Sequence, residues 1–229
     1  MTAVDETEDQ RVASRTRIVL RPIGSPLPLG FLGLVGGTVS LAGLQLGWVP
    51  QSQHATVGLV MIAFVFPLQL TSSIFGFLAR DTVAGTGMGI LAGTWLTIGI
   101  VTFQMPVVAG NRALALLLFV SAAAMLSPVA AAATGKLVPA AIMALAALRF
   151  MLTGLYQWFG SSWSHVSGWE GIVLAGLALY GALGLELEDT LRRTVLPVGR
   201  HGVGRRAIDG SLSDEIHLVG REAGVREQL

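Results

Sequence analysis

Apolar residues fill six long stretches of the chain, and short polar breaks separate them. The stretches are Pro28 to Trp48, Ala55 to Leu78, Val83 to Phe103, Ala113 to Ala133, Leu137 to Phe159 and Trp169 to Leu187. A bilayer core about 30 Å thick is crossed by a helix of about 20 apolar residues, and each stretch is close to that length. The pattern predicts six membrane-spanning helices, and the short breaks make neighbouring helices antiparallel.

A closed β-barrel is the other backbone arrangement that can cross a membrane. Barrel strands alternate apolar and polar residues with a period of two, whereas stretches such as ALALLLFVSAAAML are apolar on every face. The predicted fold is therefore an all-α integral membrane protein with a bundle of six transmembrane helices. The chain divides into an N-terminal segment (1–24), a six-helix transmembrane domain (25–196) and a charged tail (197–229), in which we expect one amphipathic helix.

The composition agrees with this fold, because 52% of the 229 residues are apolar and only 13% are charged. Basic residues gather on one side of the predicted membrane, where Arg80 and Lys136 lie in the second and fourth breaks. The opposite side carries only Arg112. The positive-inside rule then places both chain ends in the cytoplasm, with the spans in the plasma membrane.

The start of the chain bears on how it enters the membrane, and the net charge bears on its partners. The first twenty residues lack the apolar core of a cleavable signal peptide, so we expect the first span itself to direct insertion. The formal net charge of +1 gives no indication of a nucleic-acid partner. We expect the lipid membrane, and no nucleic acid, among the partners of the chain.

The sequence lacks the motifs of the common hydrolases, metalloproteases and nucleotide-binding enzymes. It has no cysteine, which excludes disulfides, thiolate metal sites and cysteine nucleophiles. His54 and His165 lie in the breaks rather than in the spans. We therefore expect no enzymatic activity, no metal and no cofactor.

Glycines recur every four residues along one face of the third span, at Gly85, Gly89 and Gly93. In lipid, small residues let helix backbones approach one another closely. Close packing within a protomer or between protomers is the expected role of this face.

Three polar side chains inside the spans are candidates for a path across the membrane. The amide of Gln69 has two donors and two acceptor lone pairs that its own helix does not satisfy. Thr94 adds a hydroxyl in the third span. Arg149 is an ionisable group deep inside the fifth span, where a charge costs roughly 2.5 to 3.5 kcal/mol. A structural role for Arg149 at a polar junction is equally open.

Glu170, near the start of the sixth span, is a candidate partner for Arg149. Side chains of a helix lean toward its N-terminus, and the fifth and sixth spans run in opposite directions. We therefore expect Arg149 to lean toward the cytoplasm and Glu170 to lean away from it. That arrangement would leave Arg149 facing a hydrated passage or a protomer interface.

Two stretches carry a family resemblance. SPLPLGFLGL, from Ser25 to Leu34, is similar to a signature NPAPLGL at the head of a first helix, and GWEGIVLAGLALYGALGLELEDTLRRTVLPVG, from Gly168 to Gly199, is similar to a last helix with a closing TVLPxG motif. Together they resemble the acetate uptake transporters, the acetate and succinate transporters of the SatP/YaaH type. The resemblance covers about residues 22–199, and the tail ending in GVREQL resembles actinobacterial members.

The resemblance implies uptake of acetate, and of succinate or other small carboxylates, through a pore within each protomer of a homohexamer. Transport would be proton-coupled or channel-like. The resemblance places the pore mouth at Ser25, Pro26, Pro28, Leu29 and Gly30. It places the C-terminal motif at Thr194, Val195, Leu196, Pro197 and Gly199. The constriction falls on Leu34, Leu91 and Ala146, where the family has Phe, Tyr and Leu, and the family's second-helix Gln matches Gln69.

The SPLPLGF stretch also predicts how the first helix begins. We expect Ser25 as the N-cap, with Pro26 and Pro28 in the first turn, where backbone N–H groups have no partner within the helix. The remaining N–H groups, at Ser25 and Leu27, would make the helix start attractive to anions.

Two other functions remain open. An aliphatic constriction suits a channel for small neutral solutes such as urea, ammonia or water, although Arg149 offers nothing to a neutral solute. A membrane sensor or scaffold that acts through the tail is the other alternative.

Overall fold

The computed structural model describes residues 23–107, 109–191, 193–202 and 204–205. The regular secondary structure of these residues is helical. Within these residues the single exception is an isolated antiparallel bridge between Lys136 and Arg200. The amphipathic helix predicted in the tail and the N-terminal segment up to residue 22 lie outside the described residues.

Six helices are long and apolar enough to cross a membrane, which confirms the predicted number of spans. Their order along the chain is α2 (Leu27–Gln45), a second span made of η1 (Gln51–Gln53), α3 (His54–Val60), η2 (Met61–Val65) and α4 (Phe66–Leu78), then α5 (Thr82–Gln104), α6 (Arg112–Ala132), α7 (Leu137–Phe159), η3 (Ser161–Trp163) and α8 (Ser164–Leu191). The bounds differ most at the sixth span, which begins at Ser164 and ends at Leu191.

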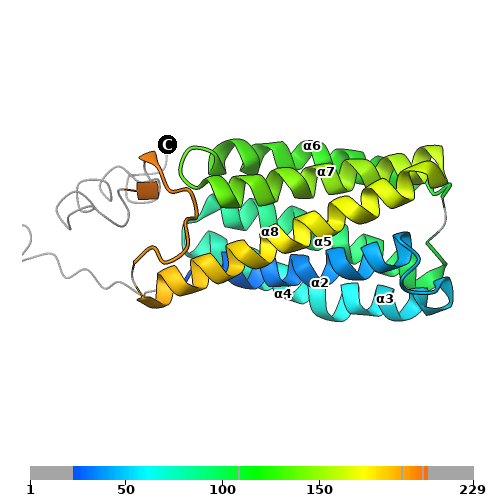
Figure 1. The fold of residues 1–229 in the computed structure, drawn as a ribbon, viewed down its shortest axis with the longest axis horizontal. Helices are drawn as coiled ribbons and strands as arrows, with labels where there is room; N and C mark the ends of the chain where they lie inside the picture. Colours follow the sequence, from blue (N-terminus) through cyan, green and yellow to red (C-terminus); the bar gives the residue numbers. More distant parts are fainter. Residues whose placement is uncertain (1–22, 108, 192, 203, 206–229) are drawn as a thin grey trace, which may run out of the picture.

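The six spans form a ring in which each packs against two neighbours (Figure 1). The second span lies between α2 and α5, α6 follows α5, α7 follows α6, and α8 lies between α7 and α2. Helix α2 also touches α5 across the ring. The core occupies the inside of the ring, where Phe31, Leu34, Leu91 and Trp95 have no exposed surface.

The second span changes helical type before a proline. Pro67 has no N–H to donate, and its ring clashes with the carbonyl one turn earlier in a regular helix. The π-helical turn η2, Met61–Val65, directly precedes this position. The wider turn lets the span continue through Pro67 into α4 without ending.

Helix α2 begins one residue later than expected, and the prediction that Ser25 is its N-cap is wrong. Pro26 occupies the cap position with α-helical dihedral angles, and no side chain caps the helix. The Pro26 carbonyl accepts the first helical bond, from the Gly30 N–H at 3.3 Å. A Ser25 cap could not use Pro28, which has no N–H, and would have only the Leu27 N–H as a donor. Instead, Ser72 Oγ of α4 donates to the Pro26 carbonyl at 2.6 Å and anchors this end.

Two members of the predicted glycine face pack against α4 and one does not. A Cβ on Gly85 would lie 2.6 Å from the Phe77 ring, and one on Gly89 would lie 3.0 Å from Ser73 Oγ. A Cβ on Gly93 would meet no atom within 4 Å. The face therefore serves mainly to bring α5 against α4.

Candidate functional site

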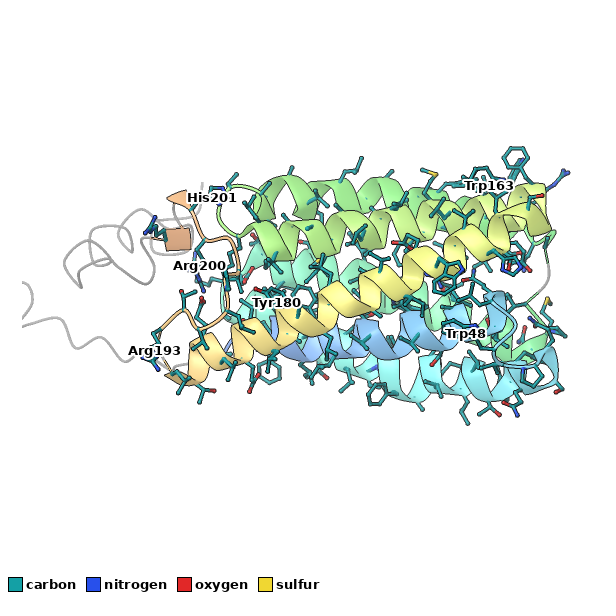
Figure 2. The ribbon with its side chains drawn as sticks, viewed as in Figure 1. Trp48, Trp163, Tyr180, Arg193, Arg200 and His201 are labelled. Carbon is teal, nitrogen blue, oxygen red and sulfur yellow. The ribbon has the colours of Figure 1, made fainter. Side chains whose placement is uncertain are left out.

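The two ends of the bundle differ in their side chains (Figure 2). Trp48 and Trp163 lie at one end, which we call the tryptophan end. Arg193, Arg200 and His201 lie at the other, which we call the arginine end, and both ends of the main described chain lie there.

A small cavity, partly open to solvent, lies at the tryptophan end. It lies among α2, α5, α6, α7 and the segment that joins α5 to α6. Its lining residues are Leu41, Ile98, Val101, Thr102, Met105, Pro106, Val107, Asn111, Leu114, Thr153 and Gln157. The wall is mostly apolar, with a few hydroxyl and amide groups.

Side chains from the second and fifth spans hold the segment that borders the cavity. Tyr156 Oη donates to the Val107 carbonyl at 3.0 Å, and the Val107 N–H donates to Gln51 Oε1 at 3.2 Å. The Asn111 N–H donates to Gln157 Oε1 at 3.3 Å. His54 Nδ1 lies 2.7 Å from the Thr102 carbonyl oxygen. The rim of the cavity is therefore built from contacts between residues far apart in the sequence.

Thr153 joins the cavity wall to a buried polar cluster. Its hydroxyl lies 2.9 Å from Ser167 Oγ of α8, which also accepts from Gln45 Nε2 of α2 at 3.2 Å. Arg149 Nη1 donates to the same Oγ at 2.9 Å and to the Ser167 carbonyl. The cluster of Gln45, Arg149, Thr153 and Ser167 thus joins α2, α7 and α8.

The side chain of Arg149 extends toward the tryptophan end, so the prediction that it leans toward the cytoplasmic side is wrong. The contacts of Gly181 with Ile142 and of Gly168 with Gln45 show that Ser167 lies nearer the tryptophan end than the backbone of Arg149 does. A buried guanidinium needs acceptors, and those of Ser167 are found in that direction. These hydrogen bonds outweigh the preferred Cα–Cβ direction.

The absence of a side chain at Gly171 makes room for this guanidinium. A Cβ there would lie 2.7 Å from Arg149 Cζ and 3.0 Å from both terminal nitrogens. Arg149 is 1% exposed, although it is one of the largest side chains in the core. The guanidinium is therefore enclosed against the backbone of α8.

Several polar atoms of this region have no hydrogen-bond partner. They include Arg149 Nε and Nη2, Gln45 Oε1 and both carboxylate oxygens of Glu170. Arg149 and Glu170 form no salt bridge, since none of their N and O atoms lie within 4.0 Å. Unused donors and acceptors thus lie buried near one another, which is costly unless a ligand uses them.

Two aromatic rings lie between the cavity and the predicted constriction. Trp95 and Phe150 pack edge to face, with ring centroids 6.1 Å apart. Both are almost completely buried. Sequence reasoning missed this pair because neither residue lies in a motif, and only the fold brings α5 and α7 together across the ring.

The predicted constriction residues lie at about one level of the ring. Gly30 packs against Met88 and Gly37 against Trp95, so Leu34 and Leu91 lie on the turns between these two contacts. Neither has any exposed surface. Water has no access to either side chain, so the interior of the ring is closed at this level.

Ala146 belongs to the same region of α7. Ile142 packs against Gly181, which also faces Phe31, and Arg149 packs against Gly171. Ala146 lies between these contacts and is 1% exposed.

The other two predicted path residues face different neighbours. Gln69 is fully buried against α2, where its Nε2 lies 3.5 Å from the Gly30 carbonyl and its Oε1 has no partner. Thr94 bonds to the Ile90 carbonyl of its own helix at 2.7 Å and lies 2.8 Å from Ser121 Oγ. Thr94 therefore serves the contact between α5 and α6.

The predicted pore-mouth residues do not share one surface. Pro26, Pro28 and Gly30 are buried, and Ser25 is half-buried. Leu29 is 37% exposed and faces away from the ring interior. The structure therefore brings together only part of this set.

The C-terminal motif forms a strap, residues 194–201, across the arginine end (Figure 1). The Leu137 and Val138 N–H groups at the start of α7 donate to the carbonyls of Gly199 and Val198 at 3.1 and 3.2 Å. The first N–H groups of a helix have no partner within it, and the strap supplies acceptors for two of them. Val198 is fully buried, so the packed part of the chain extends past residue 196.

Polar contacts hold the rest of the strap. Tyr180 Oη donates to the Pro197 carbonyl at 2.9 Å, and Thr194 Oγ1 donates to Glu188 Oε2 at 3.2 Å. Arg200 forms an ion pair with the same glutamate. Val195 is exposed and Leu196 half-buried. The motif therefore has a structural role that joins α7 to α8.

Lys136 lies beside the strap and precedes α7. Burial, and then the charge of Arg200, lowers the pKa of its amino group, whereas Asp81, Glu188 and Asp189 oppose this change.

Within the described residues, no group of three or more His, Cys, Asp or Glu side chains could hold a metal ion.

Gln45 and Ser167 are the two members of the polar cluster that sequence reasoning missed. Gln45 lies inside the first apolar stretch and, like Gln69, carries an amide with more donors and acceptors than its own helix satisfies, which is a signal for it in the sequence. Ser167 was assigned to a break between spans, and its sequence carries no signal for the contact with α7.

No protein-family model and no curated protein matches the chain. The solved structure of the bacterial acetate channel SatP is similar to it, with a TM-score of 0.69 and 20% sequence identity. The match covers 78% of this chain and 100% of that one. The likeness confirms the predicted six-helix fold.

Proposed function

We propose that this chain carries acetate, and with it succinate and other small carboxylates, across the plasma membrane through the inside of its ring of helices. The observation that carries the proposal is the buried Arg149, whose guanidinium keeps two donors unpaired next to a cavity that opens at one end of the ring. The likeness to an acetate channel favours the same substrate class.

The physical reason is the cost of moving a carboxylate through hydrocarbon. A carboxylic acid with a pKa of about 4 to 5 is mostly ionised at neutral pH, and the anion is strongly disfavoured in the bilayer core. A cation within the protein offsets part of that cost. A neutral solute gains nothing from Arg149, so the polar cluster favours carboxylates over urea or ammonia.

The proposed path begins in the cavity, passes the polar cluster and the Trp95–Phe150 pair, and crosses the level of Leu34, Leu91 and Ala146. Apolar side chains at a narrow level exclude a water column. Since these leucines are closed to water, transport requires them to move apart. Gln69 lies beyond them as an amide donor.

Topology and assembly belong to the same proposal. The basic residues of the arginine end favour a cytoplasmic location for it, so the cavity would face outward. We further propose that the protomers assemble as a homohexamer, each with its own path. Transport requires no cofactor in this account.

Labelled-acetate uptake into proteoliposomes tests the proposal. We expect uptake above that of empty liposomes, with and without a pH gradient, and no matching uptake of labelled urea. Equal urea and acetate fluxes would favour a neutral-solute channel, and the absence of acetate uptake would overturn the proposal.

Arg149→Met removes the charge while keeping an unbranched side chain. Hydrogen bonds to charged groups contribute about 1.5 to 3 kcal/mol, so we expect acetate uptake to fall roughly tenfold or more. Arg112→Met is the control, because Arg112 is exposed and its guanidinium lies 5.4 Å from the Trp158 ring at the same end. Equal uptake by the two variants would remove Arg149 from the path.

A truncation after residue 205 separates transport from signalling through the tail. We expect the shortened chain to retain acetate uptake, since the strap is left complete. Loss of uptake in a folded truncation would favour a role that depends on the tail.

A further inference from the structure

We propose that Arg149 and Gln45 form a binding site for one carboxylate group of the transported anion. We further propose that the carboxylate of Glu170 competes with this anion for the positive charge of Arg149. The inference rests on the proposed function. Its consequence is that an anion binds together with a proton, which Glu170 takes up.

The donors of the site are fixed by neighbours. Arg149 Nη1 is held by Ser167, while Nε and Nη2 of the same guanidinium are buried and unpaired. Two adjacent N–H donors on one planar group match the two oxygens of a carboxylate. The Gln45 amide is held by its bond to Ser167 Oγ, so it borders the site in a defined orientation.

The cavity leads toward the polar cluster, and most of its wall is apolar. Thr153 belongs both to the cavity wall and to the hydrogen-bonded cluster. Leu41 and Ile98 line the same cavity. A short carboxylate could therefore place its charged group at Arg149 and its methyl or methylene groups against this wall.

Glu170 is placed to oppose such a ligand. It follows Ser167 by three residues on α8, and the neighbouring Gly171 lies directly against the Arg149 guanidinium. Both of its carboxylate oxygens are buried without a hydrogen-bond partner.

No other charge competes for this role. The elements packed against this end of α8 are α7, α2 and η3. Helix α7 contributes Arg149 and the phenol of Tyr156, whereas α2 and η3 contain no ionisable residue. On α8 itself, His165 is exposed near the helix start, and the acidic residues Glu186, Glu188 and Asp189 lie near the arginine end.

These charges link anion binding to protonation. With the site empty, the Glu170 carboxylate balances the buried cation. A bound carboxylate takes over that balance, and a second negative charge beside it is repelled. Glu170 then binds a proton from solution, so one anion and one proton are held together. The spans need no other acidic group for proton-coupled transport.

Acetate binding to the full-length protein in lipid nanodiscs, followed by saturation-transfer NMR between pH 6 and 8.5, tests this linkage. In the wild type, we expect the affinity for acetate to fall by up to tenfold per pH unit as Glu170 ionises. In Glu170→Gln, we expect the affinity to stay constant across this range, since acetate itself is already ionised. Glu186→Gln, an exposed glutamate on the same helix, should retain the wild-type slope.

The same titration distinguishes the substrate's own proton from that of Glu170. If only neutral acetic acid bound, affinity would fall tenfold per pH unit in the wild type and in Glu170→Gln alike, and that result would overturn the inference. A flat wild-type profile would also overturn it. Arg149→Met is expected to weaken binding at least tenfold, and unchanged binding would contradict the site. Should Arg149→Met not fold, the pH dependence of acetate affinity in the wild type and in Glu170→Gln still tests the inference.

Proteoliposomes made from the same preparations separate this inference from the function on which it rests. Acetate uptake by the wild type, with the same pH dependence in Glu170→Gln, would overturn the linkage and leave transport intact. No uptake by the wild type would overturn both.

Discussion

At the residue scale, the hydroxyl of Ser167 holds the polar cluster together. It contacts the side chains of Gln45, Arg149 and Thr153, which come from two other spans. Each of these groups is buried, so each depends on its partner to offset the loss of water. Removing the hydroxyl leaves three polar groups with fewer bonds than they had.

We therefore predict that Ser167→Ala lowers stability by about 1 to 3 kcal/mol, the usual cost of leaving a buried polar group unsatisfied. The measurement is thermal unfolding of the detergent-solubilised protein. Ser162→Ala, at an exposed serine in η3, is the control and should unfold as the wild type does. A Ser167→Ala variant as stable as the control would show that the cluster contributes little.

Individual residues were also where the sequence misled most. The cost of a charge in the membrane identified Arg149 correctly as an unusual residue. The direction of its side chain depends on acceptors of Ser167, which are 18 positions away. Ser25 fits the preferences of an N-cap. Pro26 takes the position instead, because its carbonyl accepts a hydrogen bond from the Ser72 hydroxyl of α4. Such contacts are properties of the fold and leave no local pattern.

At the element scale, close crossings of helices replace hydrophobic attraction as the source of order. A Cβ on Gly58 of α3 would lie 2.7 Å from both the Gly99 carbonyl oxygen and the Phe103 Cα. The opposing atoms belong to the backbone of α5, which cannot move aside cheaply. The crossing of α3 and α5 therefore requires glycine at this position.

We predict that Gly58→Ala destabilises the protein by about 1 to 3 kcal/mol, as overpacking of a filled core does. Gly93→Ala is the control, because its added methyl meets no atom within 4 Å. That variant should be neutral or slightly stabilised through better helix propensity. Equal unfolding temperatures for the two variants would contradict the close crossing.

The strap offers a second comparison at this scale. Gly199 has a φ of +67°, and a Cβ there would lie 2.7 Å from the Leu137 Cβ. Gly47 has a φ of +75° with open space around it. We expect Gly199→Ala to lower the unfolding temperature more than Gly47→Ala does, since only the former adds a clash to the cost of the backbone conformation. The reverse order would show that the strap does not support α7.

Elements were the most predictable part of the structure. Five of the six spans could be bounded to within a few residues, because the length of a bilayer-crossing helix is set by bilayer thickness. The break between Phe159 and Trp169 was the exception, since α8 begins at Ser164 among polar residues. Helix ends are decided by hydrogen bonds, and here Ser164 Oγ donates to the Gln45 carbonyl, a contact that hydropathy does not report.

At the scale of the whole molecule, the ring of spans places its polar groups unequally. A cavity and a buried cation occupy the tryptophan end, whereas the ion pair of Arg200 with Glu188 and the strap occupy the arginine end. Closed apolar levels lie between them. This arrangement suits a protein that admits an anion from one side and holds the path shut until its helices move.

The sequence does not predict that the six spans close into a ring. Six antiparallel spans can pack in several orders, and the contact between α8 and α2 joins the last span to the first. Only this closure encloses an interior. The candidate path could therefore be proposed from the sequence through family resemblance, but the cavity and its polar cluster could not.

We propose that carboxylates cross the membrane through the inside of this ring. The chain has no cysteine, so a single introduced cysteine can be modified without competition. Val101→Cys places a thiol in the half-buried cavity wall, and Ser162→Cys places one at an exposed position of the same end. The measurement is labelled-acetate uptake by each variant before and after reaction with a negatively charged methanethiosulfonate reagent.

We predict that complete modification of Val101→Cys removes most of the acetate uptake, because the added group fills the cavity and repels the anion. Modified Ser162→Cys should transport as before. Undiminished uptake after complete modification of Val101→Cys would contradict a path through the ring.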